Sequence, residues 1–177
     1  MLGGRRIADH ALRALRAATT TQFIVTSDPA AARWFPGERI VADEAPGAGP
    51  LAGIASALHA AGDAAVLIVA WDMPFVTPAL LGELRTRGER GSSAVVPVHG
   101  ADARREPLCA WYGAGSLQSC RALLATGERR AGALFEVLTG ADFIGDVDLE
   151  RFGDASRLFM SVDTPERLAE LGGTLEE

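Results

Sequence analysis

The 177-residue sequence predicts a single α/β domain over residues 1–177, with a mostly parallel sheet between two layers of helices. The first indication is the stretch AVLIVA at residues 65–70, a short apolar run rich in β-branched residues and flanked by Gly62 and Pro74. Such a run is typical of a strand buried on both faces. The second is that similar runs alternate with helical patterns along the chain, without a repeat or a linker. One three-layer domain is therefore expected.

The individual elements follow from local patterns. Apolar residues at helical spacing predict a first helix over 6–18, and Thr77 with Pro78 marks the start of another that ends near Gly88. Strands at 93–98 and 107–112 are separated by a loop too short for a helical crossover, so we expect them to be antiparallel or to be joined by a wide excursion. Further strands are expected at 22–26, 39–42, near 143–146 and at the start of the tail 159–171, and further helices at 29–34, 54–61, 116–125, 131–138 and at the end of that tail.

Composition narrows the function classes. The net charge of -6 argues against a nucleic-acid partner, and the sequence has neither a membrane-spanning apolar run nor a secretory signal. Two cysteines without metal-site spacing fit a reduced, cytoplasmic protein. All 17 basic residues are arginine. A P-loop nucleotide hydrolase is thereby excluded, because its phosphate loop requires a lysine.

Asp72 is the first candidate for chemistry. It is the first charged residue after the strand at 65–70, and ligands of parallel sheets bind at the carboxyl ends of strands. The alternative is a turn residue before Pro74. Another interpretation takes residues 47–52 as a G-x-G-x-x-A dinucleotide fingerprint with Asp72 holding the ribose, although Pro50 removes one of the N–H groups that should face a pyrophosphate.

Two further aspartates have simpler structural interpretations. Asp43, beside Glu44, resembles a turn residue after a strand. Asp163 suits a helix N-cap, with Glu166 three positions later as the partner of a capping box. The three histidines show no pairing in the sequence, so packing or surface roles are expected for them.

Taken in order, the motifs resemble the molybdenum cofactor guanylyltransferase family. They are Asp43, the segment PGAGPLAGI at 46–54, DMPF at 72–75, PLCA at 107–110 and VDTPE at 162–166. The resemblance covers nearly all of the chain. It implies a Rossmann-like fold of the nucleotide-diphospho-sugar transferase type. It also implies Mg²⁺-dependent transfer of GMP from GTP to the phosphate of molybdopterin, with release of pyrophosphate.

The resemblance also implies roles for single residues. Asp72 would be catalytic, binding Mg²⁺ and the GTP phosphates, and Asp163 would approach the same metal or the molybdopterin phosphate. A hard cation with one or two carboxylates and phosphate oxygens is chemically consistent with this. The positions carried over for nucleotide binding are Thr26, Asp43, Pro50, Leu51, Gly53, Asp72 and Asp163. GTP and molybdopterin would be the small-molecule partners, with molybdopterin-delivering and molybdoenzyme-chaperone proteins as protein partners.

The chain departs from the family pattern at its start. Family members begin with a strand and a Gly-rich phosphate loop that ends in lysine, whereas residues 2–15 here match the segment after that loop. We therefore expect the first strand to be missing, a native start upstream of Met1, and a gap in the sheet beside the central strand or a partner chain that fills it. Transferase activity is expected to be weak or absent. The alternatives are a non-catalytic nucleotide-binding module or partner subunit, and cytidylyl transfer to the same cofactor.

Overall fold

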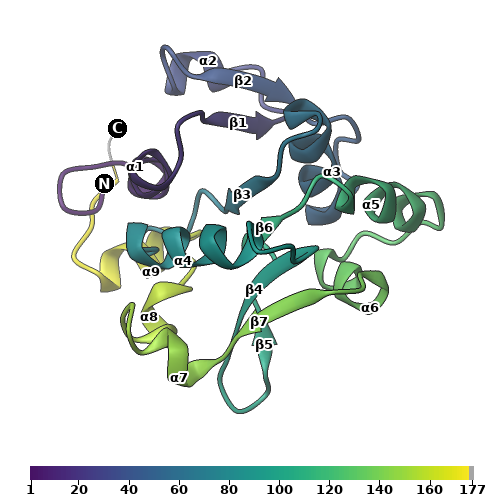
Figure 1. Cartoon of the computed structure of the whole chain (residues 1–177). Helices are drawn as coiled ribbons and strands as arrows, with labels where there is room; N and C mark the ends of the chain where they lie inside the picture. Colours follow the sequence, from purple (N-terminus) through teal and green to yellow (C-terminus); the bar gives the residue numbers. More distant parts are fainter. Residues whose placement is uncertain (176–177) are drawn as a thin grey trace.

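The computed structural model describes residues 1–175, and its helices and strands alternate from the first helix to the strand at Ala94–His99, as the sequence predicts (Figure 1). The helices are α1 (Ile7–Ala18), α2 (Ala31–Trp34), α3 (Pro50–Ala61), α4 (Pro78–Gly88), α5 (Ser116–Ala125), the 3-10 turn η1 (Ala131–Ala133), α6 (Leu134–Val137), α7 (Asp146–Leu149), α8 (Ala155–Leu158) and α9 (Pro165–Glu170). The strands are β1 (Phe23–Thr26), β2 (Arg39–Ala42), β3 (Val66–Val69), β4 (Ala94–His99), β5 (Arg104–Arg105), β6 (Cys109–Tyr112) and β7 (Ala141–Ile144).

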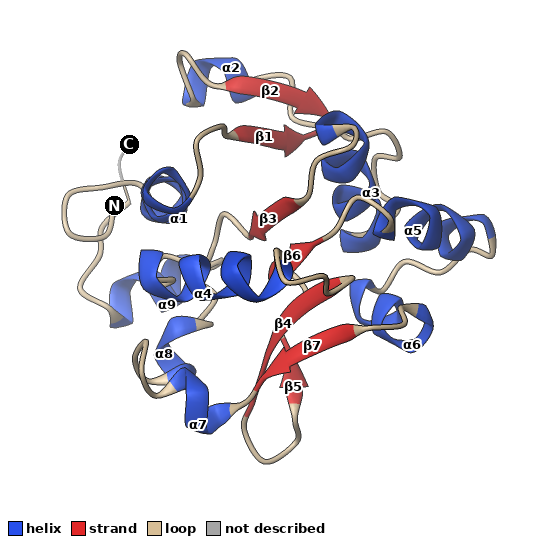
Figure 2. Cartoon of the chain, viewed as in Figure 1, coloured by secondary structure: helices blue, strands red, loops and turns tan. Residues whose placement is uncertain are grey.

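The strands form two separate sheets. β1 and β2 pair in parallel, and a second sheet has the order β3-β6-β4-β5, with β7 also paired to β4 (Figure 2). Within the described residues, no strand pairs with both β1 and β3. The expected gap beside the central strand β3 is therefore confirmed. β6 is antiparallel to β4, one of the two arrangements expected from the short loop between them, and it is also antiparallel to β3, which was not predicted. β3, β4 and β7 therefore point in one direction.

Helices cover both faces of the larger sheet. Figure 2 shows α1 and α4 on one side of the strands and α3 and α5 on the other. Side chains of β3 alternate between these layers, because Leu67 and Val69 join the cluster under α1 and α4, whereas Val66 and Ile68 join the cluster under α3 and α5. This alternation is the period of two expected for a strand between two helical layers. The three-layer α/β fold is confirmed.

Burial of β3 differs from the sequence expectation. We expected the whole run to be buried on both faces, but only Val66 is buried and the other three residues of β3 are half-buried. All four residues of β6 are buried. β6 has a paired strand on each side, whereas β3 is paired on one side only. Because no strand pairs with the other edge of β3, the side chains of β3 have a neighbouring strand on one side only.

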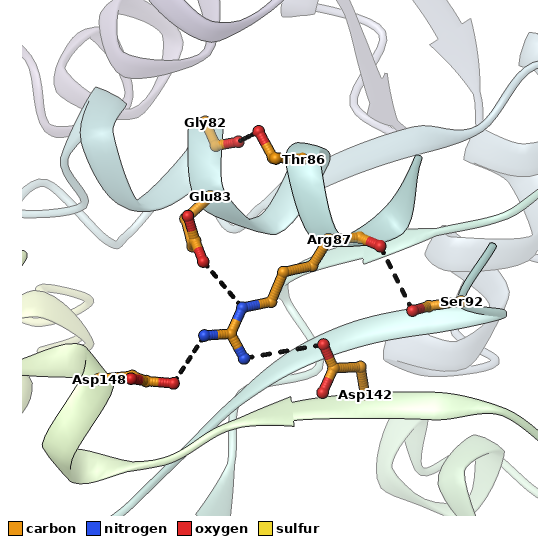
Figure 3. Close-up of polar contacts among 7 residues, drawn as sticks. All are labelled: Gly82, Glu83, Thr86, Arg87, Ser92, Asp142 and Asp148. Carbon is orange, nitrogen blue, oxygen red and sulfur yellow. Dashed lines mark hydrogen bonds and ion pairs between the residues drawn. The ribbon is translucent and has the colours of Figure 1, made fainter. Parts of the chain in front are cut away.

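Arg87 ties α4 to the far edge of the larger sheet (Figure 3). Its guanidinium donates to Glu83 at 2.8 Å and to Asp148 at 2.6 Å, and it lies 3.7 Å from Asp142 of β7. Ser92 donates to its main-chain oxygen at 3.4 Å. The hydrogen bonds to Glu83 and Asp148 raise the pKa of Arg87 above its usual value. One cation thus holds together three carboxylates from three elements.

Replacing Arg87 with methionine is expected to lower the free energy of unfolding by about 2 kcal/mol, because three partly buried carboxylates lose their shared donor. Denaturant unfolding of both proteins measures this difference. The control is Arg167→Met, which breaks the more exposed pair with Glu170 and should cost no more than about 0.5 kcal/mol. Equal losses in the two variants would contradict the role of Arg87.

Other boundaries shift for local reasons. The strand expected near 143–146 lies at Ala141–Ile144, where it follows the register of β4. The strand expected at the start of the tail does not form, and residues 159–164 are irregular. The single-turn helices α7 and α8 were not expected, because each has only four residues and no repeating apolar pattern. None of the helices in the described part of the chain combines the length and apolar character that a membrane crossing requires.

Candidate functional site

Asp72 lies in the loop between β3 and α4, where two hydrogen bonds attach it to the C-terminal tail. Ser161 donates its hydroxyl to the Oδ2 atom of Asp72, and the main-chain N–H of Val162 donates to the Asp72 carbonyl at 2.8 Å. The preceding Trp71 is 63% exposed. The loop ends where Thr77 caps α4, accepting a hydrogen bond from the N–H of Leu80. Asp72 is thus a half-buried carboxylate held in place at the carboxyl end of β3.

Asp163 does not cap the last helix. The N-cap of α9 is Thr164, whose Oγ1 accepts a hydrogen bond from the N–H of Arg167 at 3.2 Å. The interpretation of Asp163 as a helix cap is therefore wrong by one residue. Its side chain is exposed and makes no hydrogen bond or ion pair within residues 1–175. Since Val162 is bonded to Asp72, Asp163 directly follows the segment attached to that residue.

The chemistry of these two carboxylates fits a magnesium ion. No arginine or histidine of the described residues pairs with Asp72 or Asp163, so neither negative charge is neutralised by the chain. Mg²⁺ prefers oxygen ligands and keeps several waters or substrate phosphate oxygens in its shell. Within residues 1–175 no group of three or more His, Cys, Asp or Glu side chains is arranged to hold a metal. Two carboxylates cannot fill the coordination shell of Mg²⁺ by themselves. They suit an ion that a phosphate substrate also coordinates.

A second set of predicted residues meets at the ends of β1 and β2. The N–H of Asp43 donates to the carbonyl of Thr26 at 3.3 Å, so the two residues are adjacent. The Asp43 carboxylate accepts hydrogen bonds from the hydroxyl of Ser56 at 3.0 Å and from the N–H of Ala45 at 3.2 Å. Ser56 is buried in α3 and also accepts from the N–H of Glu44. Asp43 is therefore fixed against α3, with its second carboxylate oxygen available.

The N-terminus of α3 is largely closed to anions. Pro50 has no N–H, and the N–H of Leu51 donates to the carbonyl of Arg129 at 3.3 Å. Gly49 has a φ of +80°, and a Cβ there would lie 2.9 Å from the same carbonyl oxygen, so only glycine fits. A dinucleotide fingerprint needs these amides for its pyrophosphate. The hydrogen bond to Arg129 therefore argues against that interpretation.

The remaining predicted pocket residues differ in accessibility. Leu51 is 0% exposed as a whole residue, with its side chain in the core and its N–H bonded to the Arg129 carbonyl, so it lies beneath the surface of the predicted pocket. Pro50 is exposed at the first turn of α3. Gly53 is half-buried, and no atom would lie within 4 Å of a Cβ added there. The assignment of these residues to a nucleotide pocket stays a prediction.

Arg129 is a candidate residue that no pattern in the sequence indicates. Besides its carbonyl bond to Leu51, its guanidinium donates to the carbonyl of Gly47 at 3.4 Å. It has no carboxylate partner in the described residues, whereas Arg130 pairs with Glu128 and lowers the pKa of that carboxyl to about 2. Arg129 therefore offers an exposed positive charge beside the loop before α3. Its partner Gly47 is 82 positions away, so no local pattern could have located it.

His99 and Glu106 form a buried polar pair at the same sheet edge as Asp72. β3 and β4 are both antiparallel to β6, so the ends of β3 and β4 lie at one edge. Nε2 of His99 lies 2.8 Å from Glu106, which is 3% exposed, and Arg104 donates to the same carboxylate at 3.0 Å. The His99 ring stacks on Phe159, with centroids 4.9 Å apart. The sequence shows no pairing for His99, and the structure pairs it with Glu106, seven positions away.

The candidate residues thus fall into two groups on either side of the divided sheet. One group comprises Thr26, Asp43, the start of α3 and Arg129, and the other comprises Asp72 and the tail around Asp163. No hydrogen bond or ion pair joins the two groups within residues 1–175. α3 packs against β1, β2 and β3, and so bridges the division.

Comparison with known proteins places the chain in a family. The model of the MobA-like NTP transferase domain matches residues 1–141. The chain is 32% identical over 130 residues to the probable molybdenum cofactor guanylyltransferase of Chloroflexus aggregans, covering 73% of this chain and 62% of that protein. It is 33% identical over 132 residues to the protein of the same name from Pelotomaculum thermopropionicum, covering 75% and 62% respectively. The chain therefore spans 62% of the length of each of these relatives.

Solved structures agree with this assignment. The crystal structure of molybdopterin-guanine dinucleotide biosynthesis protein A from Archaeoglobus fulgidus matches with a TM-score of 0.79 and 27% identity, covering 97% of this chain and 86% of that one. The 2-C-methyl-D-erythritol 4-phosphate cytidylyltransferase of Thermus thermophilus, with a TM-score of 0.70, 18% identity and coverage of 97% and 89%, shares the fold. The chain belongs to the MobA-like NTP transferase domain family, whose members are nucleotidyltransferases.

Proposed function

We infer that this chain binds GTP with Mg²⁺ and belongs to an enzyme that transfers GMP to the phosphate of molybdopterin. The observation that carries this proposal is Asp72, a carboxylate without a cation partner that Ser161 and Val162 hold at the carboxyl end of β3. Relatives named as molybdenum cofactor guanylyltransferases support the choice of nucleotide and acceptor. A cytoplasmic location and contacts with molybdopterin-delivering and molybdoenzyme-chaperone proteins are part of the same proposal.

Each group of residues has a part in this proposal. Asp72 and Asp163 hold the metal, and Ser161 orients the Asp72 carboxylate by donating to one of its oxygens. When bound, Mg²⁺ neutralises charge that develops on the transferred phosphate. Thr26 and Asp43 contact the nucleoside from the ends of β1 and β2, and Arg129 places a positive charge beside the same loop.

The nucleotide pocket of the proposal is completed by Pro50, Leu51 and Gly53 at the start of α3, where Leu51, which is fully buried, supports the pocket from beneath. Their position next to Arg129 gives this part of the surface both apolar and cationic character. Such a combination suits a nucleoside that carries phosphates.

A non-catalytic nucleotide-binding module is the second candidate. The observation that favours it is the division of the candidate residues between two sheets that share no strand pairing in the described residues. The sequence also has no lysine to offset the charge of a triphosphate. Transition-state stabilisation depends on fixed donors around the reacting phosphate. We therefore expect slow GMP transfer by this chain even where GTP binds.

The test is a calorimetric titration of the chain with GTP in the presence and absence of MgCl₂. Mg²⁺-dependent binding is expected, and Asp72→Asn should weaken it at least about tenfold, because the neutral amide is a poorer ligand for a hard cation. Asp63→Asn, a change at an exposed aspartate in the turn before β3, is the matched control and should leave binding unchanged.

Separate results distinguish the alternatives. Binding of GTP that is indifferent to both Mg²⁺ and Asp72 would contradict the metal site. Mg²⁺-dependent binding without formation of the guanine dinucleotide cofactor would favour the non-catalytic module. Tighter binding of CTP than of GTP would favour cytidylyl transfer.

A further inference from the structure

The segment between α8 and α9 is attached to the ends of two strands of the larger sheet. Phe159 stacks on the ring of His99 at the end of β4, with ring centroids 4.9 Å apart and planes 28° from parallel. Two residues later, the hydroxyl of Ser161 donates to Asp72 in the loop after β3. β6 lies between β4 and β3 in the sheet. Residues 159–163, which we call the strap, therefore run from the end of β4 to the Asp72 loop.

The strap has few main-chain hydrogen bonds. In the described residues, its one main-chain hydrogen bond outside the last turn of α8 joins the N–H of Val162 to the carbonyl of Asp72, at 2.8 Å. Paired strands fix their shape through a ladder of such bonds, which the strap lacks. Its shape depends instead on two buried side chains, those of Phe159 and Val162, which are each 4% exposed. The surface on which Phe159 rests therefore affects where Ser161 meets Asp72.

That surface is the ring of His99, which a polar network holds in one orientation. Nε2 of His99 lies 2.8 Å from the Glu106 carboxylate, and Nε of Arg104 donates to the same oxygen atom at 3.0 Å. Because a carboxylate accepts hydrogen bonds, Nε2 carries a hydrogen. The main chain of Glu106 is fixed as well, since its N–H donates to the carbonyl of Pro97 at 3.0 Å. Rotation of the ring would take a donor from a buried carboxylate, which is unfavourable.

A buried carboxylate is not needed to pack an aromatic side chain. An apolar ring at position 99 would stack on Phe159 without the cost of taking a charge out of water. Position 99 instead has a ring with an apolar face and a polar edge, and Glu106 holds that edge. The pair of His99 and Glu106 thus fixes the orientation of the ring, which packing alone does not provide.

We propose that His99 is a positioning residue for Asp72. Its ring, oriented by Glu106, holds Phe159 in place. The strap then carries that position to Ser161, whose hydroxyl orients the Asp72 carboxylate. The metal-binding role of Asp72 rests on the proposed function, whereas the connection from His99 to Asp72 does not.

Two substitutions separate the ring from the hydrogen bond. His99→Gln keeps an amide that can donate to Glu106 but removes the ring, and His99→Phe keeps a ring but removes the donor. The measurement is amide hydrogen exchange of the isotope-labelled chain by NMR, with the rate at Val162 divided by the mean rate in β6. This ratio should rise at least about tenfold in His99→Gln and stay within about threefold of the unaltered chain in His99→Phe. A side chain that only adds stability would change Val162 and β6 together.

The second measurement is a calorimetric titration with GTP in MgCl₂. His99→Gln should weaken binding at least about fivefold, because residues that orient a metal ligand affect metal affinity, and His99→Phe should restore it to within about twofold. The matched control is His10→Gln in α1, where Nε2 of His10 lies 3.0 Å from the Leu2 carbonyl. It should change neither the exchange ratio nor the binding of GTP. If the unaltered chain binds no GTP, the proposed function fails, while the exchange ratio still tests His99.

Three results would overturn the proposal. An unchanged exchange ratio in His99→Gln would leave the contact of Arg157 with the ring of Phe75, at 4.8 Å, as the attachment that holds the strap. An equal rise of the ratio in His99→Gln and His99→Phe would show that the ring face does not hold it. An unchanged ratio in Phe159→Leu, which removes the other ring of the stack, would contradict the proposal independently. That variant leaves His99 unaltered, so the test does not depend on folding of His99→Gln.

Discussion

Replacing Gly88 with alanine is expected to lower the free energy of unfolding by about 3 kcal/mol. Gly88 ends α4 directly above the indole ring of Trp111 in β6. A Cβ at this position would lie 2.2 to 2.6 Å from three ring carbons, which is far inside van der Waals contact. Trp111 is buried in the cluster under α1 and α4, so its ring has no free space to move into. Thermal or denaturant unfolding measures the loss.

Two further variants test whether the loss of stability in Gly88→Ala comes from its clash with Trp111. Gly82 lies in the same helix with nothing within 4 Å of an added Cβ, so Gly82→Ala should stabilise the chain by about 0.5 kcal/mol through helix propensity. Trp111→Leu should remove part of the clash, so the double variant with Gly88→Ala should lose at least about 1 kcal/mol less than the sum of the single losses. Additive losses would show that the two residues do not compete for space.

In the folded chain, both cysteines are expected to react with a disulfide reagent at pH 8 at least about 1000-fold more slowly than in the unfolded chain. Cys109 and Cys120 are each 0% exposed. Burial raises the pKa of Cys120 to about 12 and that of Cys109 further above its usual range. The reactive thiolate is therefore scarce as well as inaccessible. Absorbance of the released thiolate, with and without denaturant, measures the two rates.

The same pKa shifts give a pH dependence of stability. A thiol whose pKa is raised by folding stays protonated in the native state, while the unfolded thiol ionises above about pH 8.5. The stabilisation is complete below that pH and is lost as pH rises toward 12. Cys120→Ala should reduce the slope of the free energy of unfolding against pH above 8.5. A reactive thiol in the native chain, or an unchanged slope, would contradict the burial of these residues.

Much of the fold follows from local sequence patterns. The strand at Arg39–Ala42 and the helix at Ser116–Ala125 lie at the residues predicted, since their ends coincide with changes in hydrophobic period. The antiparallel pairing of β4 and β6 is one of the two arrangements that loop length indicated. The division of the sheet followed from the resemblance to a family that has one more strand. In each case the deciding information lay within a few neighbouring residues or in motif order.

The unpredicted parts of the candidate site depend on contacts between distant residues. Ser161 lies 89 positions from Asp72, and Arg129 lies 82 positions from Gly47. Neither contact can be inferred from motif spacing or from the hydrophobic pattern of the sequence. The half-buried state of β3 has the same origin, because its composition is that of an interior strand and only the missing neighbour exposes it.

The attachment of Asp72 to Ser161 and Val162 has a consequence for the order in which the protein is made. Asp72, β3 and α4 emerge during synthesis long before the tail that holds the carboxylate, since the contact spans 89 positions. Until residues 159–163 are available, the Asp72 loop lacks two of its hydrogen bonds. The two carboxylates of the proposed metal site are therefore made at different stages of synthesis, first Asp72 and much later Asp163. A nascent chain therefore has β3 and α4 well before it has the site.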